Sequence, residues 1–410
     1  MKKIISLALV LFAVTIGTID ACTTAVISGK YTKDGRPLLW KNRDTFFVKN
    51  KIMQFDDGKY SSTGLVNSLD TSGMSIWIGY NSAGFGIMNS ASYNLNNDTI
   101  EQTGLEGRVM REALKSCATV DEFEQFLLDM EEPRRLEANF GVIDGNGGAA
   151  YFELGNFKVI KIDANDPSVA PNGYLIRTNY SFNGIAGKGG GYIRYVTASK
   201  IFDNAVKSNN LTAQMIIQDA TRNLTHSLTG DNLWDYEDLK EGEDKMVFFV
   251  DYIPRSGSSS SCVVEGVKPG ENTNLTTMWT VLGWPLASVT IPVFINKNDN
   301  IPEVLTFDAG IGDAPLCNFA LTLKSECYSQ KWGTSKKYYL NVNKLLNADG
   351  TGIVQLNADL DNSLFDQSYK LLNKWRDEGR SDKDLQEFYG DVDKQVISHY
   401  SNTYGLKIEK

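Results

Sequence analysis

The sequence predicts an α+β fold in which two antiparallel sheets pack face to face and helices cover their outer faces. Three observations support this prediction. The 410 residues have a globular composition, 42% hydrophobic and 22% charged, and such a chain is long enough to bury a full-size core. Glycine-punctuated, β-rich stretches fill the N-terminal part and residues 246–283. Helical periods form separate blocks between and after them, which favours packed sheets over a parallel βαβ series.

Residues 1–21 have the features of a signal peptide, which is removed from the mature chain. Lys2 and Lys3 give a positive start, and Ile19 and Ala21 fit the −3 and −1 positions of a cleavage site. The apolar stretch between them, about fifteen residues, is too short to cross a bilayer as a helix. We therefore expect an exported protein, periplasmic or extracellular, without an integral membrane span.

The mature chain is acidic. Removing Lys2, Lys3 and Asp20 changes the formal net charge from −9 to −10. This balance argues against a nucleic-acid partner, which would require a basic face. No spacing of His, Cys and carboxylate residues suggests a metal site, and we expect no cofactor. Oligomeric state cannot be read from the sequence, and a homo-oligomer stays open.

The N-terminal part of the mature chain has the pattern of paired strands. The Asp34-Gly35 turn separates the first two of them. The expected strands are CTTAVISG (22–29), RPLLWKNRD (36–44), MSIWIGYN (74–81) and AGFGIMNSA (83–91). Residues 104–130 change to a helical period, with a capping-box signature at Thr119–Glu122.

Strands and helices alternate in blocks through the rest of the chain. NFGVIDGNGGAAYFEL (139–154) predicts two strands around a turn, and GYLIRTNYSF (173–182) a third. We expect a flexible surface loop at the glycines of 187–191. Further helices are expected over 192–207, 212–224 and the tail, about 363–400, with strands at MVFFVDYI (246–253), SCVVEGV (261–267) and MWTVLG (278–283).

An odd number of cysteines in an exported chain indicates one free thiol. Cys317 and Cys327 are the first choice for a disulfide because they are close in sequence. Cys22 would then remain free, directly after the predicted cleavage site. The five cysteines are Cys22, Cys117, Cys262, Cys317 and Cys327.

Cys22 could act as a nucleophile if a base accepts its proton, because the thiolate is the reactive form. The chain has two histidines, His226 and His399, and neither lies in a motif typical of a cysteine–histidine pair. Cleavage after Ala21 would supply another base. The α-amino group of Cys22 has an ordinary pKa near 8 and lies within reach of its own side chain.

Several motifs in order carry a family resemblance. CTTAVISG and DGRPLLWKNRD at the N-terminus are followed by YNSAGFGIMN, NFGVIDGNGGAAYFE, RTNY and MWTVLGWP, which together span most of residues 22–290. The chain resembles the choloylglycine hydrolase, penicillin acylase and acyl-coenzyme A:6-aminopenicillanic acid acyltransferase group of N-terminal-nucleophile (Ntn) cysteine hydrolases. The Cys-Thr-Thr start is closer to the acyltransferase-like branch.

The resemblance implies a four-layer αββα sandwich that hydrolyses a linear, non-peptide C–N amide bond. We expect the catalytic domain at residues 22–335 and a helical C-terminal extension, packed on the core, at 336–410. The partner would be a small-molecule N-acyl amide. The acyl group and the amine cannot be read from the sequence.

The resemblance also assigns roles to particular residues. Cys22 would be the nucleophile, and Asp44 the carboxylate that holds its amine by a charge-assisted hydrogen bond. The family has an arginine three residues before this aspartate, whereas this chain has Lys41 there and an arginine at Arg43. On an extended strand these two share a face and Asp44 points the other way, so Lys41 is the first candidate by alignment and Arg43 the second.

Three further residues complete the implied site. Asn179, in RTNY, would donate to the oxyanion, and Asn89 is the candidate second contributor. Arg255, in IPRSGSSSS, matches a late family arginine near the catalytic aspartate.

Two alternatives stay open. The same residues could transfer the acyl group to an amine instead of water. Alternatively, Cys22 could be the lipidated first residue of a lipoprotein that binds a ligand without turnover. Asp20 and the β-rich run directly after Cys22 oppose a lipid anchor, and N-acylation would remove the base.

Overall fold

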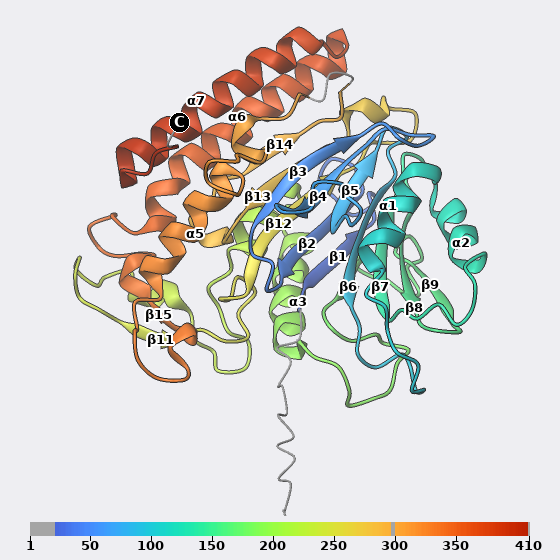
Figure 1. The fold of residues 1–410 in the computed structure, drawn as a ribbon, viewed down its shortest axis with the longest axis horizontal. Coiled ribbons are helices and arrows are strands. Elements are labelled where there is room, and N and C mark those ends of the chain that lie inside the picture. Colours follow the sequence, from blue (N-terminus) through green and yellow to red (C-terminus); the bar gives the residue numbers. More distant parts are fainter. Residues whose placement is uncertain (1–20, 297–299, 409–410) are drawn as a thin grey trace, which may run out of the picture.

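The computed structural model describes residues 21–296 and 300–408. Of the predicted signal peptide it therefore describes Ala21 alone. Two large antiparallel sheets stack on each other, and helices lie on both outer sides (Figure 1). The αββα arrangement expected from the sequence is confirmed. No helix among the described residues combines the length and apolar character that crossing a membrane requires.

The first sheet contains the strand that follows Cys22 and has six strands in the order β10-β1-β2-β12-β13-β14. Every pair in it is antiparallel. Its strands come from distant parts of the sequence. They are β1 (Thr23–Ile27), β2 (Leu38–Asp44), β10 (Tyr174–Arg177), β12 (Ser258–Glu265), β13 (Thr277–Leu282) and β14 (Ile291–Val293).

The second sheet is a meander of seven strands in sequence order. Each strand pairs antiparallel with the next one along the chain. The strands are β3 (Asn50–Phe55), β4 (Ser62–Asn67), β5 (Ile78–Asn81), β6 (Gly86–Ala91), β7 (Ala138–Ile143), β8 (Ala149–Leu154) and β9 (Val159–Asp163).

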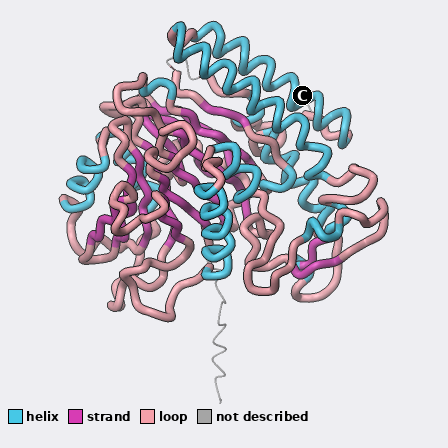
Figure 2. The backbone as a smooth tube through the Cα atoms, turned by 180° about the vertical axis from the view of Figure 1, so that it is seen from behind, coloured by secondary structure: helices cyan, strands magenta, loops and turns pink. Residues whose placement is uncertain are grey.

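Alternating side chains divide the first sheet between two cores, because successive strand residues face opposite sides. On β2, Leu39 packs into the core between the sheets, whereas Leu38 and Trp40 face the helical layer. That layer contains α3 (Tyr192–Lys207) and α6 (Ile353–Glu378), and Figure 2 shows α3 crossing the back of the sheet. The helices α1 (Glu106–Ser116) and α2 (Val120–Leu128) cover the second sheet.

Several helices begin at a side-chain cap or a glycine. Thr119 caps α2 by accepting from the Glu122 N–H at 3.1 Å, while the Glu122 carboxylate accepts from Ala118 N. The long C-terminal helices are confirmed, and the 335/336 domain boundary stays a prediction. The helices are α1 (Glu106–Ser116), α2 (Val120–Leu128), α3 (Tyr192–Lys207), α4 (Ala213–Met215), α5 (Pro315–Cys327), α6 (Ile353–Glu378) and α7 (Asp382–Tyr404).

Three sequence predictions need correction. The expected helix 212–224 is one short turn, α4, continued by a π-helical segment, Ile216–Thr221. MVFFVDYI supplies only β11 (Met246–Phe248), which pairs with β15 (Tyr339–Asn341) outside both large sheets. The proposed Cys317–Cys327 disulfide is wrong, because both free thiols lie on α5. Ten residues of helix rise about 15 Å, too far for a disulfide.

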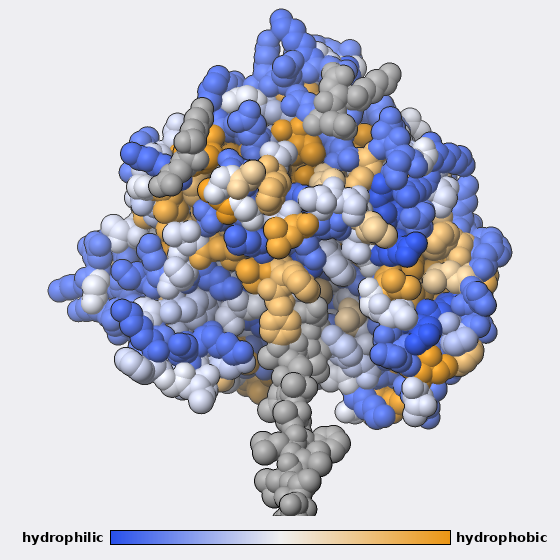
Figure 3. All heavy atoms as spheres, viewed as in Figure 1, coloured by the Kyte–Doolittle hydropathy of each residue, from blue (hydrophilic) through white to orange (hydrophobic). Residues whose placement is uncertain are grey.

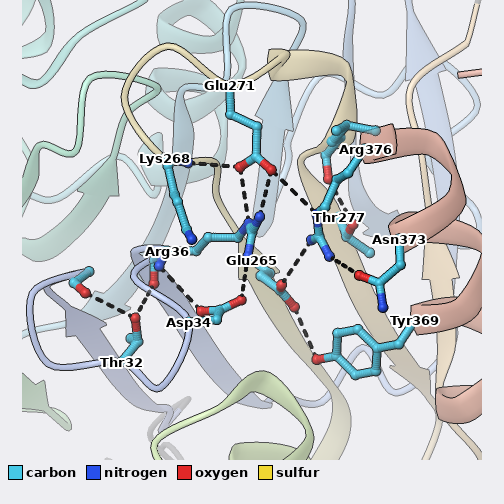
Figure 4. Close-up of polar contacts among 12 residues, drawn as sticks. Thr32, Asp34, Arg36, Glu265, Lys268, Glu271, Thr277, Tyr369, Asn373 and Arg376 are labelled. Atoms are coloured by element: carbon cyan, nitrogen blue, oxygen red, sulfur yellow. Dashed lines mark hydrogen bonds and ion pairs between the residues drawn. The ribbon is translucent and has the colours of Figure 1, made fainter. Parts of the chain in front are cut away.

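A buried polar cluster joins α6 to the first sheet (Figure 4). Glu265, at the end of β12, accepts from Trp279 Nε1 at 2.9 Å and from the Tyr369 hydroxyl of α6 at 3.2 Å. Arg376 of α6 lies 3.8 Å from the same carboxyl. Burial, assisted by the nearby Asp34 charge, raises the pKa of Glu265 to about 7. The folded state therefore favours the neutral carboxyl.

We predict that Glu265→Gln flattens the dependence of stability on pH. A raised folded-state pKa stabilises the fold fully below the unfolded value, near 4.5, and this contribution is lost as pH rises through 7. Relative to Glu265→Gln, the wild type should lose about 2–3 kcal/mol of unfolding free energy between pH 4.5 and 8. Urea unfolding across this range measures it. Glu387→Gln, on an exposed carboxylate of α7, is the control, and parallel pH curves for Glu265→Gln and wild type would contradict the assignment.

Candidate active site

Cys22 directly precedes β1, which lies between β2 and β10 in the first sheet. The register pairs Thr23 with Asn42 on one side and Thr24 with Arg177 on the other. The end of β2 and the residues after β10 therefore lie beside the start of β1. Ala21 and Cys22 are themselves buried, 8% and 7% exposed.

Asp44 ends β2 within a shell of polar groups. Its Oδ1 accepts from Ser258 Oγ at 2.5 Å and from Asn42 Nδ2 at 3.2 Å. Its Oδ2 forms an ion pair with Arg255, whose Nη2 lies 3.0 Å away. Burial raises the pKa of Asp44, while Arg255 and Arg194 oppose this rise.

The carbonyl ahead of Cys22 lies at the same place. Arg255 Nη2, which pairs with Asp44, also donates to Ala21 O at 3.1 Å. The Ala21–Cys22 peptide is thus held next to the Asp44 carboxylate. Cleavage of this peptide would leave an amine close to the same carboxylate.

Arg194, on α3, is a site residue that the sequence analysis missed. Its Nη1 donates to Cys22 O at 2.6 Å and to Thr23 Oγ1 at 2.7 Å, and its Nη2 donates to Asn179 Oδ1 at 2.9 Å. All three acceptors are neutral. Burial, with Arg255 acting in the same direction, lowers the pKa of Arg194 to about 10. In sequence it is an ordinary arginine within a predicted helix, so nothing marked it.

Asn179 follows β10, and Arg194 fixes its orientation. Because Oδ1 accepts from Arg194, the amide nitrogen is turned the other way, and it donates to Ala91 O at 3.1 Å. The Asn179 backbone forms two hydrogen bonds of 3.0 Å with Gly190. Arg194 thus links the Asn179 amide, in a fixed orientation, to the backbone carbonyl of Cys22.

The loop 187–191, expected to be a free surface loop, is tied to the site at its second half. Gly190 pairs with Asn179, and Gly191 begins α3 with φ of 89°. A Cβ at Gly191 would lie 2.3 Å from Arg194 Nη2. A side chain at this position would therefore displace the arginine, which explains why glycine stands there.

Lys41 and Arg43 point between the sheets, away from the Asp44 side, as strand alternation predicts. Lys41 Nζ donates to Asn89 Oδ1 at 2.7 Å and to Trp77 O at 2.9 Å. Arg43 contacts Asn50 and Asn67 on the second sheet, with its guanidinium 4.5 Å from the Trp77 ring centroid. The structure thus brings Asn89 to Lys41, and it pairs Arg43 with two other amides.

Neither histidine belongs to this group. His226 contacts Thr229, and His399 contacts Asn357 near the C-terminus. In the part of the chain that the structure describes, no three His, Cys, Asp or Glu side chains gather as a metal site would require.

A cavity of about 920 Å³ opens beside this group of residues. Asp44, Asn179, Arg194 and Arg255 are among its lining residues, together with Ala21. Its walls are largely apolar, and Figure 3 shows hydrophobic residues gathered near the middle of one face of the molecule. The volume suits a small organic molecule.

Comparison with known proteins gives structural similarity without sequence similarity. No protein-family model and no curated protein matches the sequence. A mutant of the conjugated bile acid hydrolase from Clostridium perfringens superposes with a TM-score of 0.40 and 12% identity, covering 68% of this chain and 93% of that one. Penicillin V acylase from Agrobacterium tumefaciens gives 0.36 and 12%, covering 68% and 87%. The Caenorhabditis elegans ortholog of N-acylethanolamine-hydrolyzing acid amidase gives 0.36 and 14%, covering 49% and 88%.

We predict that Arg194→Gln lowers the unfolding free energy by about 2–4 kcal/mol, because it leaves buried acceptors without their charged donor. Urea unfolding of residues 22–410 measures the change. Arg108→Gln is a matched control, since Arg108 is also the third residue of its helix but is exposed. A loss below about 0.5 kcal/mol for Arg194→Gln, typical of surface positions, would show that these contacts do not hold the site together.

Proposed function

We propose that the mature chain, residues 22–410, is an exported amidohydrolase, periplasmic or extracellular, that cleaves linear, non-peptide N-acyl amides through an acyl-enzyme on Cys22. The observation that carries the proposal is the surroundings of the Ala21–Cys22 peptide. A buried carboxylate, an oriented amide and a cavity meet at the residue where export processing would leave a free amine.

In the proposed reaction, the Cys22 amine accepts the thiol proton and the thiolate attacks the substrate carbonyl carbon. The carbonyl oxygen becomes an oxyanion, to which Asn179 donates. The Asp44 carboxylate stabilises the ammonium by a charge-assisted hydrogen bond. As the oxyanion collapses, the C–N bond breaks and the ammonium gives its proton to the leaving amine. A thioester remains on Cys22.

Water completes the cycle. The free amine of Cys22 takes a proton from water, which attacks the thioester carbonyl, and collapse releases the carboxylic acid and the thiol. A competing amine in place of water would turn the same intermediate into a transfer product. Product analysis with and without an added amine distinguishes hydrolysis from transfer.

Cys22→Ala should abolish amide hydrolysis, and Cys22→Ser should reduce it sharply because the hydroxyl is a weaker nucleophile at neutral pH. Released amine from a panel of N-acyl amides is the measurement, and mass spectrometry should detect the acyl-enzyme in the wild type. Cys117→Ala, which removes another buried thiol, should retain turnover. Normal activity in Cys22→Ala would rule the mechanism out.

A chain that starts at Ala21 tests the amine separately from the thiol. It keeps Cys22 but converts its amine into a peptide, so it should be inactive while its intact mass confirms that Ala21 is retained. Intact mass of the secreted protein also tests the lipoprotein alternative. An unmodified mass for residues 22–410 agrees with the proposal, and an added diacylglycerol contradicts it.

Asn179→Ala should lower kcat by about 10²–10³, because the donor acts on charge that develops after attack. KM should change little. Asn172→Ala is the control, since its amide contacts Asp203 on the surface. A fall in kcat below tenfold for Asn179→Ala would remove Asn179 from the mechanism.

A further inference from the structure

A lysine from the C-terminal part of the chain lies on the cavity wall. Lys324, on α5, donates to the carbonyl of Ser256, the neighbour of Arg255. Among the described residues, no carboxylate lies within 4.0 Å of its ammonium, because Asp44 is paired with Arg255 instead. This largely buried cation therefore has no carboxylate in direct contact.

The cavity as a whole is more positive than the protein that contains it. In the described part of the chain its lining has four cations and one carboxylate, Arg194, Arg255, Lys324, Lys337 and Asp44, although the full chain has a net charge of −9. A concave site lined by one sign of charge attracts ligands of the other sign. The lining therefore favours an anion.

Much of the remaining lining is apolar and partly exposed. Phe46 and Phe248 are 63% and 53% exposed, and Leu321 of α5 and Tyr328, which follows α5, line the same cavity as Lys324. Burying such surface against a ligand is favourable, by about 25 cal/mol per Å². The ligand that fits both features has an apolar body and an anionic group.

We propose that Lys324 is a specificity-determining residue that binds a negatively charged group of the substrate, away from the amide that is cleaved. The preferred substrates are then N-acyl amides with an apolar chain and such a charged group. This inference rests on the proposed function. The inference adds a substrate class to the proposed function. It assigns the selectivity for anionic substrates to a residue of α5, which lies outside both sheets.

The protonation of Lys324 predicts how the preference for an anionic substrate depends on pH. Burial lowers its pKa to about 8, while Asp44 from β2 and Cys317 on α5 oppose this shift. Other charged or titratable groups facing the cavity are Arg194, Arg255, Tyr328, Lys337 and Tyr338. As pH rises through 8 the ammonium becomes neutral, and preference for an anion should disappear.

The experiment compares three substrates with the same chain length: N-dodecanoylglycine, its neutral analogue N-dodecanoylglycinamide, and the monoamide of dodecanedioic acid with glycinamide, which moves the carboxylate to the acyl end. The ratio of kcat/KM between anionic and neutral substrate is the readout. Titration of the Cys22 amine affects both substrates and cancels in this ratio.

For wild type we expect a ratio of about 10–100 at pH 7 for one of the two anions, falling toward one at pH 9. Lys324→Gln should give a ratio near one at both pH values. Lys324→Arg should keep the preference at pH 9, because a guanidinium stays charged. Lys383→Gln, on the exposed face of α7, should behave as wild type.

A wild-type ratio that Lys324→Gln leaves unchanged would overturn the inference while the proposed function stands. If wild type cleaves none of the amides, Kd values for the same compounds, measured by calorimetry on Cys22→Ala with and without Lys324→Gln, test the anion site by itself. Equal Kd values for anionic and neutral compounds would overturn it there too.

Discussion

The pairing of β1 with a strand on each side is the constraint on which the site depends. β2 and β10 both run antiparallel to β1, so the end of each lies at its beginning. This pairing brings Asp44 and Asn179 beside the start of β1, although they lie far apart in sequence. A register change of one residue would reverse the faces of their side chains. The precision of the site is therefore a property of the sheet.

The buried cations of the molecule are of two kinds. Some pair with a carboxylate and hold elements of the fold together, whereas others line the cavity and contact neutral oxygens. Arg222 makes two hydrogen bonds to the Asp361 carboxylate of α6, at 2.7 and 2.9 Å, and ties this helix to the π-helical segment. Arg194 and Lys324 instead contact neutral oxygens. Uncompensated charge is costly in the interior. Its presence around one cavity suggests that the cavity is built to receive negative charge.

Local patterns in the sequence predicted much of the fold, whereas the site required contacts between distant segments. The alternation in LLWKNRD predicts that Asp44 and Lys41 face opposite sides, and their contacts confirm it. β3 and β4 were missed because the mixed polarity of NKIMQF and STGLVN gives no clear period. The helix at 212–224 has the expected apolar face, but tertiary packing converts part of it to a π-helical turn.

The residues of the site also fall into those that local motifs predict and those that only folding brings together. Asp44 and Asn179 were predicted from the motifs KNRD and RTNY, which lie in or next to expected strands. Nothing in the sequence could place Arg194 or Lys324, because their importance comes only from what folding brings next to them. Arg194 differs from Arg108 in burial, and both occupy the third position of a helix.

The burial of Cys22 at the start of a central strand restricts what can be joined to the protein. A fusion or affinity tag attached directly before Cys22 would occupy its amine and would begin beside the cavity, which Ala21 lines. The helix α7 lies in the outer layer of the molecule, whereas β1 lies near its centre (Figure 1). Purification handles and surface immobilisation therefore belong at the C-terminal end.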